Sequence, residues 1–388
     1  MDNRPNIEVV YRGRFPDNYI NDVNGWAFSE KYIKENLGKL LTLDIDFGIK
    51  CSLNCPHCFR KNNPVDDIEK SSLKYDELIT VLDEAKALGL KSVKFLGKGE
   101  PFESGKIIEL LKYFKKNDII PLIFTKGHII GDDNNVKKYF SKYGIYTSKE
   151  LIEFLNEVNA SILLGFNSFD KDIQNKMVGD GKFKNSKKTY WDLRNKALEL
   201  LVEAGFNKHN PTRLCLATNP LTKDNYDEIF EIYKWGRERN MYVIVTPSMI
   251  SGRAHFNEYW KEITPSPEKI IKLYTDIYIY NIQKNIQTFE QVLKEGIASY
   301  AGGHPCNQIS VGMYITLNGT VLRCPGDDIT VLGNVRFEKL ESIWKRSENY
   351  GRCGQFNCGC PPKWGKSIPY NLFTEVMLNL KRYFGDIV

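Results

Sequence analysis

Residues 41–58 have the sequence LTLDIDFGIKCSLNCPHC. In its first half apolar residues alternate with Asp44 and Asp46, so residues 41–47 are expected to form a β-strand that has both aspartates on one face. Three cysteines follow in a short loop, at positions 51, 55 and 58. In parallel α/β sheets, ligands bind at the carboxyl ends of the strands. We therefore expect the chemistry of this protein to begin at this loop.

Beyond the loop, β-rich runs alternate with amphipathic helical stretches, which is the pattern of a parallel sheet built from βα units. Six strands are expected, at residues 41–47, 92–96, 121–125, 160–166, 213–217 and 242–247. Six units are too few for a closed eight-stranded barrel. The sequence thus predicts an α/β fold whose main part is a partial (β/α)6 TIM-like barrel.

Sequence patterns typical of helices lie between these strands. Thr147 and Glu150 form a capping box at the start of one helix, and Gly89 and Gly205 follow the apolar stripes of two others. Residues 227–239 provide a further helical stretch.

The pattern divides the chain into four segments. Residues 1–40 are an N-terminal extension without clear periodicity, residues 41–263 the partial barrel, and residues 264–305 two connecting helices. Residues 306–388 are expected to form a small C-terminal domain that a last amphipathic helix closes. Within it, Asn318-Gly319 suits the tight turn of a β-hairpin.

The composition is that of a globular chain, since 42% of the 388 residues are hydrophobic and 26% are charged. No apolar run reaches the roughly 18 residues of a membrane span. The N-terminal residues are charged where a signal peptide needs an apolar core, so we expect a cytoplasmic protein with no membrane partner. The formal charge of +6 comes from interleaved lysines and arginines rather than one basic block, so no nucleic-acid partner is expected.

The nine cysteines are better explained as metal ligands than as disulfides, because cytosolic thiols are kept reduced. Three thiolates, those of Cys51, Cys55 and Cys58, suit a [4Fe–4S] cluster whose fourth iron stays open for a ligand. A tetrahedral zinc site is the alternative, with His57 or a distant residue as the fourth ligand.

The C-x3-C-x2-C spacing after the first strand resembles the hallmark of the radical SAM superfamily, in which an iron–sulfur cluster cleaves S-adenosylmethionine (SAM) to a 5′-deoxyadenosyl radical. A second motif agrees with this resemblance. Lys98-Gly99-Glu100-Pro101 follows the second strand, where the family has a Gly-Gly-Glu-Pro motif that contacts the methionyl amino group. Lys98 stands at the position of the first glycine, and Gly97 precedes it.

Further residues are implied only by this resemblance. Thr125 belongs to a Thr-Lys-Gly that is similar to the family's Thr-Asn-Gly, and Asn167 and Ser168 end the fourth strand, where family side chains meet the ribose or carboxylate of SAM. The backbone of His57 is expected to contact the adenine. Arg253 lies in a Gly-Arg-Ala stretch common among relatives and is expected to contact SAM or substrate. The implied cofactors are SAM and a SAM-binding [4Fe–4S] cluster.

The second cysteine group comprises Cys306, Cys324, Cys353, Cys358 and Cys360. Four of these thiols suit a second iron–sulfur cluster, with structural zinc as the alternative. The segment resembles the C-terminal SPASM extension of radical SAM enzymes or its shorter "twitch" form. A full SPASM pattern needs thiols for two clusters, so five imply one auxiliary [4Fe–4S] cluster, which accepts an electron from a substrate radical.

Two residues are catalytic candidates. Cys215, between two leucines of the fifth strand, is either a core thiol or a hydrogen-atom donor. Asp46, like Asp44, is either a base for the substrate or the partner of an inward-facing Arg or Lys. Lys126 and His128 lie in a loop after the third strand that is either solvated or reaches the site.

The resemblance implies a radical SAM oxidoreductase that acts on a peptide as a maturase of a ribosomally made product, with flavodoxin or ferredoxin as electron donor. Two alternatives stay open. One is a dehydrogenase or epimerase of a small polar molecule such as a sugar or aminocyclitol. The other is a non-catalytic iron–sulfur or zinc protein.

Overall fold

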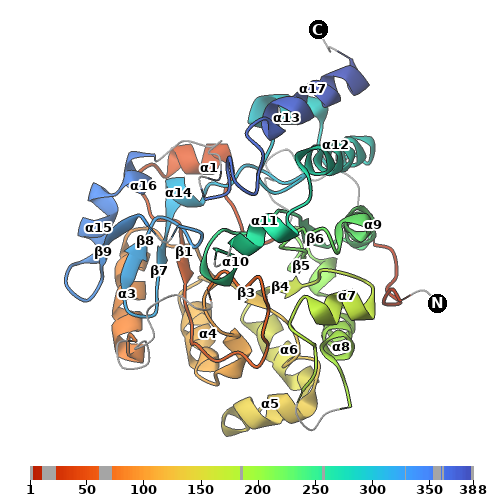
Figure 1. Ribbon diagram of the computed structural model, residues 1–388. Helices are drawn as coiled ribbons and strands as arrows, with labels where there is room; N and C mark the ends of the chain where they lie inside the picture. Colours follow the sequence, from red (N-terminus) through yellow and green to blue (C-terminus); the bar gives the residue numbers. More distant parts are fainter. Residues whose placement is uncertain are drawn as a thin grey trace.

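Six parallel strands form the centre of the molecule (Figure 1). The computed structural model describes residues 3–10, 23–60, 72–183, 187–255, 258–327, 329–352, 360 and 362–385. The strands are β1 (Thr42–Ile45), β2 (Ser92–Phe95), β3 (Ile120–Thr125), β4 (Ser161–Gly165), β5 (Leu214–Ala217) and β6 (Tyr242–Ile244). Each pairs in parallel with the next in chain order, and β6 forms one edge of the sheet. The predicted open, partial barrel is therefore confirmed.

Three C-terminal strands continue this sheet on the other side of β1. β7 (Gly312–Ile315) pairs in parallel with β1, and β8 (Thr320–Leu322) and β9 (Val331–Asn334) follow in antiparallel order. The predicted hairpin is present, and Gly319 adopts a φ of 84°, which glycine tolerates without steric cost. This pairing places Cys306 and Cys324 of the second cysteine group near the first strand of the barrel.

Helices cover the outer face of the six parallel strands (Figure 1). They include α3 (Tyr75–Ala87), α4 (Ile107–Lys116), α5 (Asp133–Phe140), α6 (Ser148–Glu157), α8 (Tyr190–Glu203) and α9 (Tyr226–Arg237). The predicted capping box of Thr147 and Glu150 begins α6. Each helix buries an apolar stripe against the sheet, and each fully buried large apolar side chain contributes about 1.5–3 kcal/mol.

Three further helices lie together at one end of the molecule (Figure 1): α12 (Pro267–Gln283), α13 (Phe289–Glu295) and α17 (Leu372–Phe384). The remaining elements are short. They are α1 (Glu30–Glu35), α7 (Lys171–Lys176), α10 (Gly252–His255), α11 (Tyr259–Ile263), α14 (Gln308–Val311), α15 (Leu340–Arg346), α16 (Glu348–Gly351) and the 3-10 helices η1 (Pro101–Glu103), η2 (Ser141–Tyr143) and η3 (Phe206–Lys208).

Residues just before α1 close the amino-terminal end of the barrel. Val23 forms a bridge with Thr212, and the Ser161 hydroxyl donates to the Asn24 carbonyl at 2.9 Å. A Cβ at Gly25 would lie 2.9 Å from the Leu122 side chain, so only glycine allows this close approach. The opposite, carboxyl end of the strands is where the cysteine loop lies.

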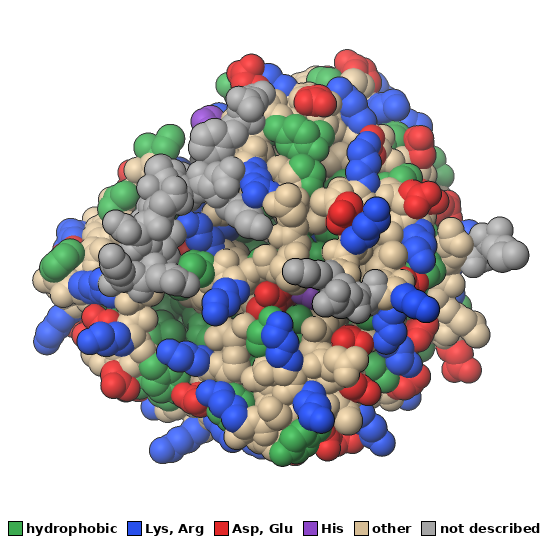
Figure 2. All heavy atoms as spheres, turned by 60° about the horizontal axis from the view of Figure 1, so that its bottom comes forward, with side chains coloured by type: hydrophobic (Ala, Val, Ile, Leu, Met, Phe, Trp, Pro, Cys, Tyr) green, Lys and Arg blue, Asp and Glu red, His purple; other side chains and the backbone are tan. Residues whose placement is uncertain are grey.

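Basic and acidic side chains are interspersed on the face of the molecule shown in Figure 2. This agrees with the interleaved charges of the sequence. Within the described ranges, no helix has both the length and the apolar character needed to cross a bilayer.

Candidate active site

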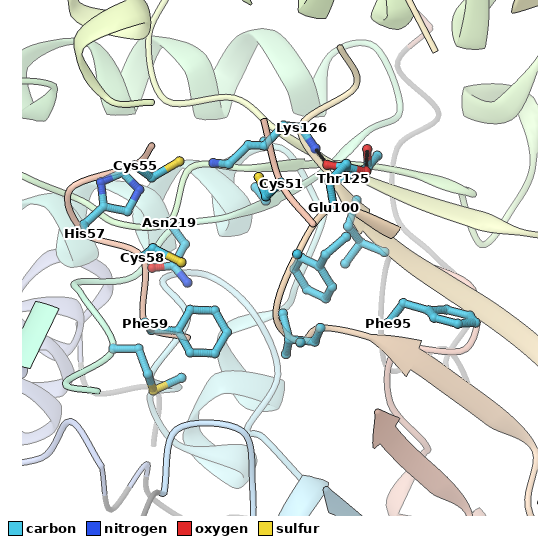
Figure 3. Close-up of a pocket in the computed structure, with 18 of the residues that line it drawn as sticks. Cys51, Cys55, His57, Cys58, Phe59, Phe95, Glu100, Thr125, Lys126 and Asn219 are labelled. Atoms are coloured by element: carbon cyan, nitrogen blue, oxygen red, sulfur yellow. Dashed lines mark hydrogen bonds between the residues drawn. The ribbon is translucent and has the colours of Figure 1, made fainter. Parts of the chain in front are cut away.

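A cavity of about 980 Å³, partly open to solvent, lies at the carboxyl ends of the strands (Figure 3). The loops after β1, β2, β3, β5 and β6 contribute to its wall, as does the strand β4 itself. The three cysteines of the first group line it, as do Gly97, Gly99, Glu100, Pro101, Thr125 and His57. The structure thus brings most of the predicted SAM-site residues together.

The cysteine loop is anchored from one side by α10. The Arg253 backbone N–H donates to the Cys58 carbonyl at 2.9 Å, and its guanidinium donates to Asn54 Oδ1 at 2.6 Å and to the Cys55 carbonyl at 3.2 Å. A Cβ at Gly252 would lie 2.3 Å from the Phe59 carbonyl oxygen. Arg253 is not among the residues that line the cavity, so its contacts in this structure are with the loop.

A second anchor joins the loop to η1 and to the loop after β3. The Ser52 N–H and hydroxyl both donate to Glu103 Oε1 at 2.7 Å, and His128 Nε2 lies 3.0 Å from the same oxygen. Burial raises the pKa of Glu103, but the bonds from His128 and Ser52 outweigh it and hold the pKa below its usual range. These contacts fix the backbone next to Cys51.

The three thiols lie in apolar surroundings that include Leu53, Val178 and Tyr190. Burial raises the pKa of Cys51 to about 12, and the Glu100 carboxylate adds to this effect. Among the described residues, no three His, Cys, Asp or Glu side chains converge closely enough for one metal ion. Each iron of a cubane cluster takes a single thiolate, so a cluster does not require such convergence. A pocket that presents three thiols in apolar surroundings therefore fits a [4Fe–4S] cluster.

The turn after β2 explains why a lysine is tolerated in the glycine motif. A Cβ at Gly97 would lie 1.9 Å from Asp46 Oδ1, and one at Gly99, where φ is 77°, would lie 2.8 Å from the Lys50 carbonyl oxygen. Lys98 is not among the cavity-lining residues, and its backbone N–H donates to Asp46 Oδ1 at 2.7 Å. Glycine is thus needed on both sides of Lys98, whereas position 98 accepts a side chain.

Glu100 presents a buried carboxylate at the cavity wall. Its Oε1 accepts a hydrogen bond from Thr125 Oγ1 at 2.6 Å, and its Oε2 accepts one from the Lys126 backbone N–H at 2.8 Å. Burial raises the pKa of Glu100 above its usual value. A carboxylate held in this way can accept a hydrogen bond from the amine of a ligand.

Two further cavity residues carry nitrogen side chains. Removal from water lowers the pKa of the His57 ring to about 3, and Lys126 adds to this effect, so the ring is neutral. The Lys126 side chain extends over the cavity toward Cys51 and Cys55 (Figure 3). Its ammonium suits the carboxylate of a ligand.

The two residues predicted at the end of β4 lie beside the cavity rather than in its wall. The Ser168 hydroxyl donates to Glu228, and the backbone N–H groups of Asn167 and Ser168 donate to Gln174 Oε1 at 2.8 and 3.1 Å. The side-chain amide of Asn167 is buried, and neither of its polar atoms has a hydrogen-bond partner. The predicted contact of Asn167 and Ser168 with SAM therefore stays a prediction.

The aspartates of β1 have different surroundings. Asp46 is buried and accepts bonds from Arg60 at 3.2 Å and from the Tyr314 hydroxyl at 2.5 Å, so the structure favours its role as an ion-pair partner. Asp44 lies 3.7 Å from Lys94 Nζ, and burial raises the pKa of Asp44 to about 6. Neither aspartate lines the cavity of the first cysteine group.

Cys215 lies within the barrel, fully buried in an apolar cluster with Leu122 and Leu163. Leu163 lines the cavity, whereas Cys215, its register partner on β5, does not. The structure thus favours the core thiol over the hydrogen-atom donor.

A second cavity, of about 650 Å³, lies between the barrel and the C-terminal segment. Cys306, Cys324 and Cys360 line it together, whereas Cys353 and Cys358 lie outside the described residues. Leu96 and Met249 line both cavities, so the two cysteine sites share a wall.

Sequence reasoning missed several residues of the first cavity, among them Asn219, Ser248 and Met249. Asn219 follows β5, and the other two follow β6. Their position at the carboxyl ends of strands is the signal that could have identified them.

Two family models match the chain. That of the radical SAM superfamily matches residues 45–236, and that of the iron–sulfur cluster-binding SPASM domain matches residues 306–362. A curated relative, GTP 3′,8-cyclase from Clostridium perfringens, is 33% identical over 104 residues, which are 26% of this chain and 32% of the relative. The match thus spans about a third of the relative's length.

Several solved structures share the fold. SuiB from Streptococcus suis is 19% identical, with a TM-score of 0.54 over 83% of this chain and 69% of that one. The protein anSMEcpe with bound AdoMet is 14% identical, with a TM-score of 0.57 over 88% of this chain and 96% of that one. A structure of anSMEcpe with AdoMet and the Cp18Cys peptide gives a TM-score of 0.54 at 14% identity, over the same shares of the two chains.

Proposed function

Because the chain belongs to the radical SAM superfamily and carries a C-terminal SPASM domain, we propose that it is a peptide-modifying enzyme that oxidises its substrate by two electrons. SAM and a [4Fe–4S] cluster are the cofactors of the barrel, and an auxiliary cluster is the cofactor of the SPASM domain. The observation that carries the proposal is the wall of Leu96 and Met249 that the two cysteine-lined cavities share. A substrate that contacts this wall from the first cavity lies between the two cysteine sites.

Cys51, Cys55 and Cys58 would hold the first cluster, and SAM would occupy the part of the cavity next to it. When bound, this cluster supplies the electron that splits SAM into methionine and the 5′-deoxyadenosyl radical. Glu100 accepts a hydrogen bond from the methionyl amine, and Lys126 pairs with the methionyl carboxylate. The contacts of Arg253 and Glu103 keep the cysteine loop in place. This matters because a displacement of reacting groups by about 1 Å lowers the reaction rate strongly.

Cys306, Cys324 and Cys360 hold the auxiliary cluster, with a fourth thiol from Cys353 or Cys358. In the proposed reaction the substrate loses one hydrogen atom to the 5′-deoxyadenosyl radical, which becomes 5′-deoxyadenosine. The resulting substrate radical would then give one electron to the auxiliary cluster and one proton to solvent, to which the first cavity is partly open. The two losses together form a new double bond or ring bond in the substrate.

A peptide is proposed as the substrate because the fold is shared, over most of both chains, with a structure of anSMEcpe that holds AdoMet and the Cp18Cys peptide. The first cavity is also partly open to solvent, which allows a side chain of a peptide to enter while its backbone remains outside. Flavodoxin or ferredoxin is proposed as the electron donor.

The test uses the full chain, reconstituted anaerobically with iron and sulfide. With reductant and SAM it is expected to form 5′-deoxyadenosine, and a peptide substrate is expected to raise this yield and to lose two hydrogen atoms by mass spectrometry. Failure to form 5′-deoxyadenosine would contradict the proposal. So would a yield that rises only with a sugar, an aminocyclitol or a nucleotide.

A further inference from the structure

A lysine ammonium is buried beside the second cysteine group. The side chain of Lys363 has an exposed fraction of 0%, and its Nζ donates to Thr246 Oγ1 at 2.7 Å. The ring of Tyr300 lies 5.4 Å from the same nitrogen. A hydroxyl and an aromatic ring carry no negative charge that would offset the ammonium.

The side chain of Lys363 lies beside the second cysteine site. The Lys363 backbone N–H donates to the Cys360 carbonyl at 3.0 Å, so this lysine belongs to the turn that follows Cys360. Tyr300, whose ring lies next to the ammonium, lines the second cavity together with Cys306, Cys324 and Cys360.

Burying an ammonium without an opposite charge is unfavourable. If the three thiols were protonated, they would offer Lys363 no such charge, whereas thiolates bound to iron do. The position of Lys363 is therefore explained by an anionic cluster in the second cavity.

A buried lysine that does line the second cavity, Lys94, shows the contrast. Lys94 Nζ lies 3.7 Å from Asp44 Oδ1 and donates to Gln308 at 2.8 Å. The charge of Lys94 is thus offset within the protein itself. The charge of Lys363 is instead placed to act on the cluster that the cysteines bind.

We propose that Lys363 is a fixed positive charge that raises the reduction potential of the auxiliary cluster and so makes it a better electron acceptor. This inference rests on the proposed function. Uptake of one electron changes [4Fe–4S]²⁺ to [4Fe–4S]⁺ and makes the cluster with its thiolates more negative by one charge. A nearby ammonium stabilises the more negative state more strongly, and burial keeps water from screening it.

Thr246 has a supporting role as a positioning residue. It follows β6, and its hydroxyl donates to the Ser299 carbonyl at 2.9 Å while its oxygen accepts from Lys363. The hydroxyl thereby fixes the end of a flexible side chain to the barrel.

The test is a redox titration of the reconstituted holoprotein, followed by EPR. K363M keeps an unbranched side chain and removes the charge, so the auxiliary cluster is expected to titrate at a more negative potential, while the SAM-binding cluster in the same sample does not move. K363R keeps the charge and is expected to retain most of the wild-type value. K366M is the matched control, because it removes an exposed lysine from the same turn. Water screens the charge of Lys366, so no shift in the potential is expected.

A second variant, T246V, leaves the lysine in place and removes the oxygen that holds it. The potential is expected to shift in the same direction as in K363M, but by less. Unchanged potentials in both variants, at full iron content, would overturn the role of Lys363 and leave the proposed function standing. A wild-type chain that binds iron only at the first cysteine site would instead overturn the proposed function.

Discussion

The two cysteine sites differ in the buried charged side chains next to them. At the first, the carboxylates of Glu100 and Glu103 are buried next to the loop that carries the thiols. At the second, the buried ammonium of Lys363 lies next to Tyr300, which lines the cavity with the cysteines, and the buried Lys94 is paired with Asp44. The first site also opens into the larger cavity.

This difference suits the two opposite roles that we propose. Negative charge near a cluster makes an electron easier to give up, and positive charge makes one easier to accept. Carboxylates also suit SAM, whose sulfonium and amine are cationic. The surroundings of each site thus favour electron flow into SAM at the first and out of the substrate at the second.

The two sites are separated most directly when the thiols of each are removed in turn. The triple variant C51A/C55A/C58A is expected to form no detectable 5′-deoxyadenosine and to lose about four irons per chain, because the electron source is gone. C306A/C324A is expected to lose a similar amount of iron, yet still to cleave SAM. Product analysis by liquid chromatography and an iron assay measure both. Equal loss of SAM cleavage in the two variants would show that the sites are not functionally separate.

The next effect concerns Glu100. E100Q replaces a carboxylate oxygen by an amide NH₂ that faces the donors Thr125 and Lys126, so we expect SAM to bind about 10–100-fold more weakly, which corresponds to about 1.4–2.7 kcal/mol. Equilibrium dialysis of the reconstituted protein measures this. E109Q, at an exposed glutamate, is the matched control and is expected to bind SAM as the wild type does. Wild-type affinity in E100Q would mean that the carboxylate does not contact the ligand.

A smaller effect is expected at Glu103, which locks the first loop. E103Q weakens the bonds to Ser52 and His128, and we expect it to lower the free energy of unfolding by about 1–2 kcal/mol at pH 7. Folding lowers the pKa of this carboxyl, so its stabilisation is present above the unfolded pKa and is lost as the pH falls through the folded value. Chemical denaturation at several pH values measures this. A difference between E103Q and wild type that stays constant down to low pH would contradict the assignment.

The local features of this fold could be predicted from the sequence. Periodicity gave the six parallel strands, Asn318-Gly319 gave the hairpin, and short spacing gave the loop of three thiols. Each of these depends on residues that are close in the chain, whose geometry follows from backbone preferences.

What the sequence could not predict depends on distant contacts. No local pattern indicates that β7 pairs with β1, that Tyr314 binds Asp46, or that Met249 separates two cavities. Lys363 is one lysine among many in the chain, and only the folded structure shows that it is buried beside Cys360. The charge contrast between the two sites therefore became visible only in three dimensions.

The smallest expected effect tests whether the anchor at Arg253 serves the first site alone. R253K keeps the charge but loses the geometry with which one guanidinium nitrogen reaches both Asn54 and the Cys55 carbonyl, and the contact is partly exposed, so about 0.5–1 kcal/mol is expected. In the C306A/C324A background, where all cluster iron belongs to the first site, this predicts about 2–5-fold faster iron loss to a chelator. R336K, the same change at an exposed arginine near Glu77, is the control and should leave that rate unchanged. Equal rates of iron loss in R253K and in the parent variant C306A/C324A would mean that the loop keeps its shape without the Arg253 contacts. The contacts of Glu103 with Ser52 and His128 would then be sufficient to anchor the loop.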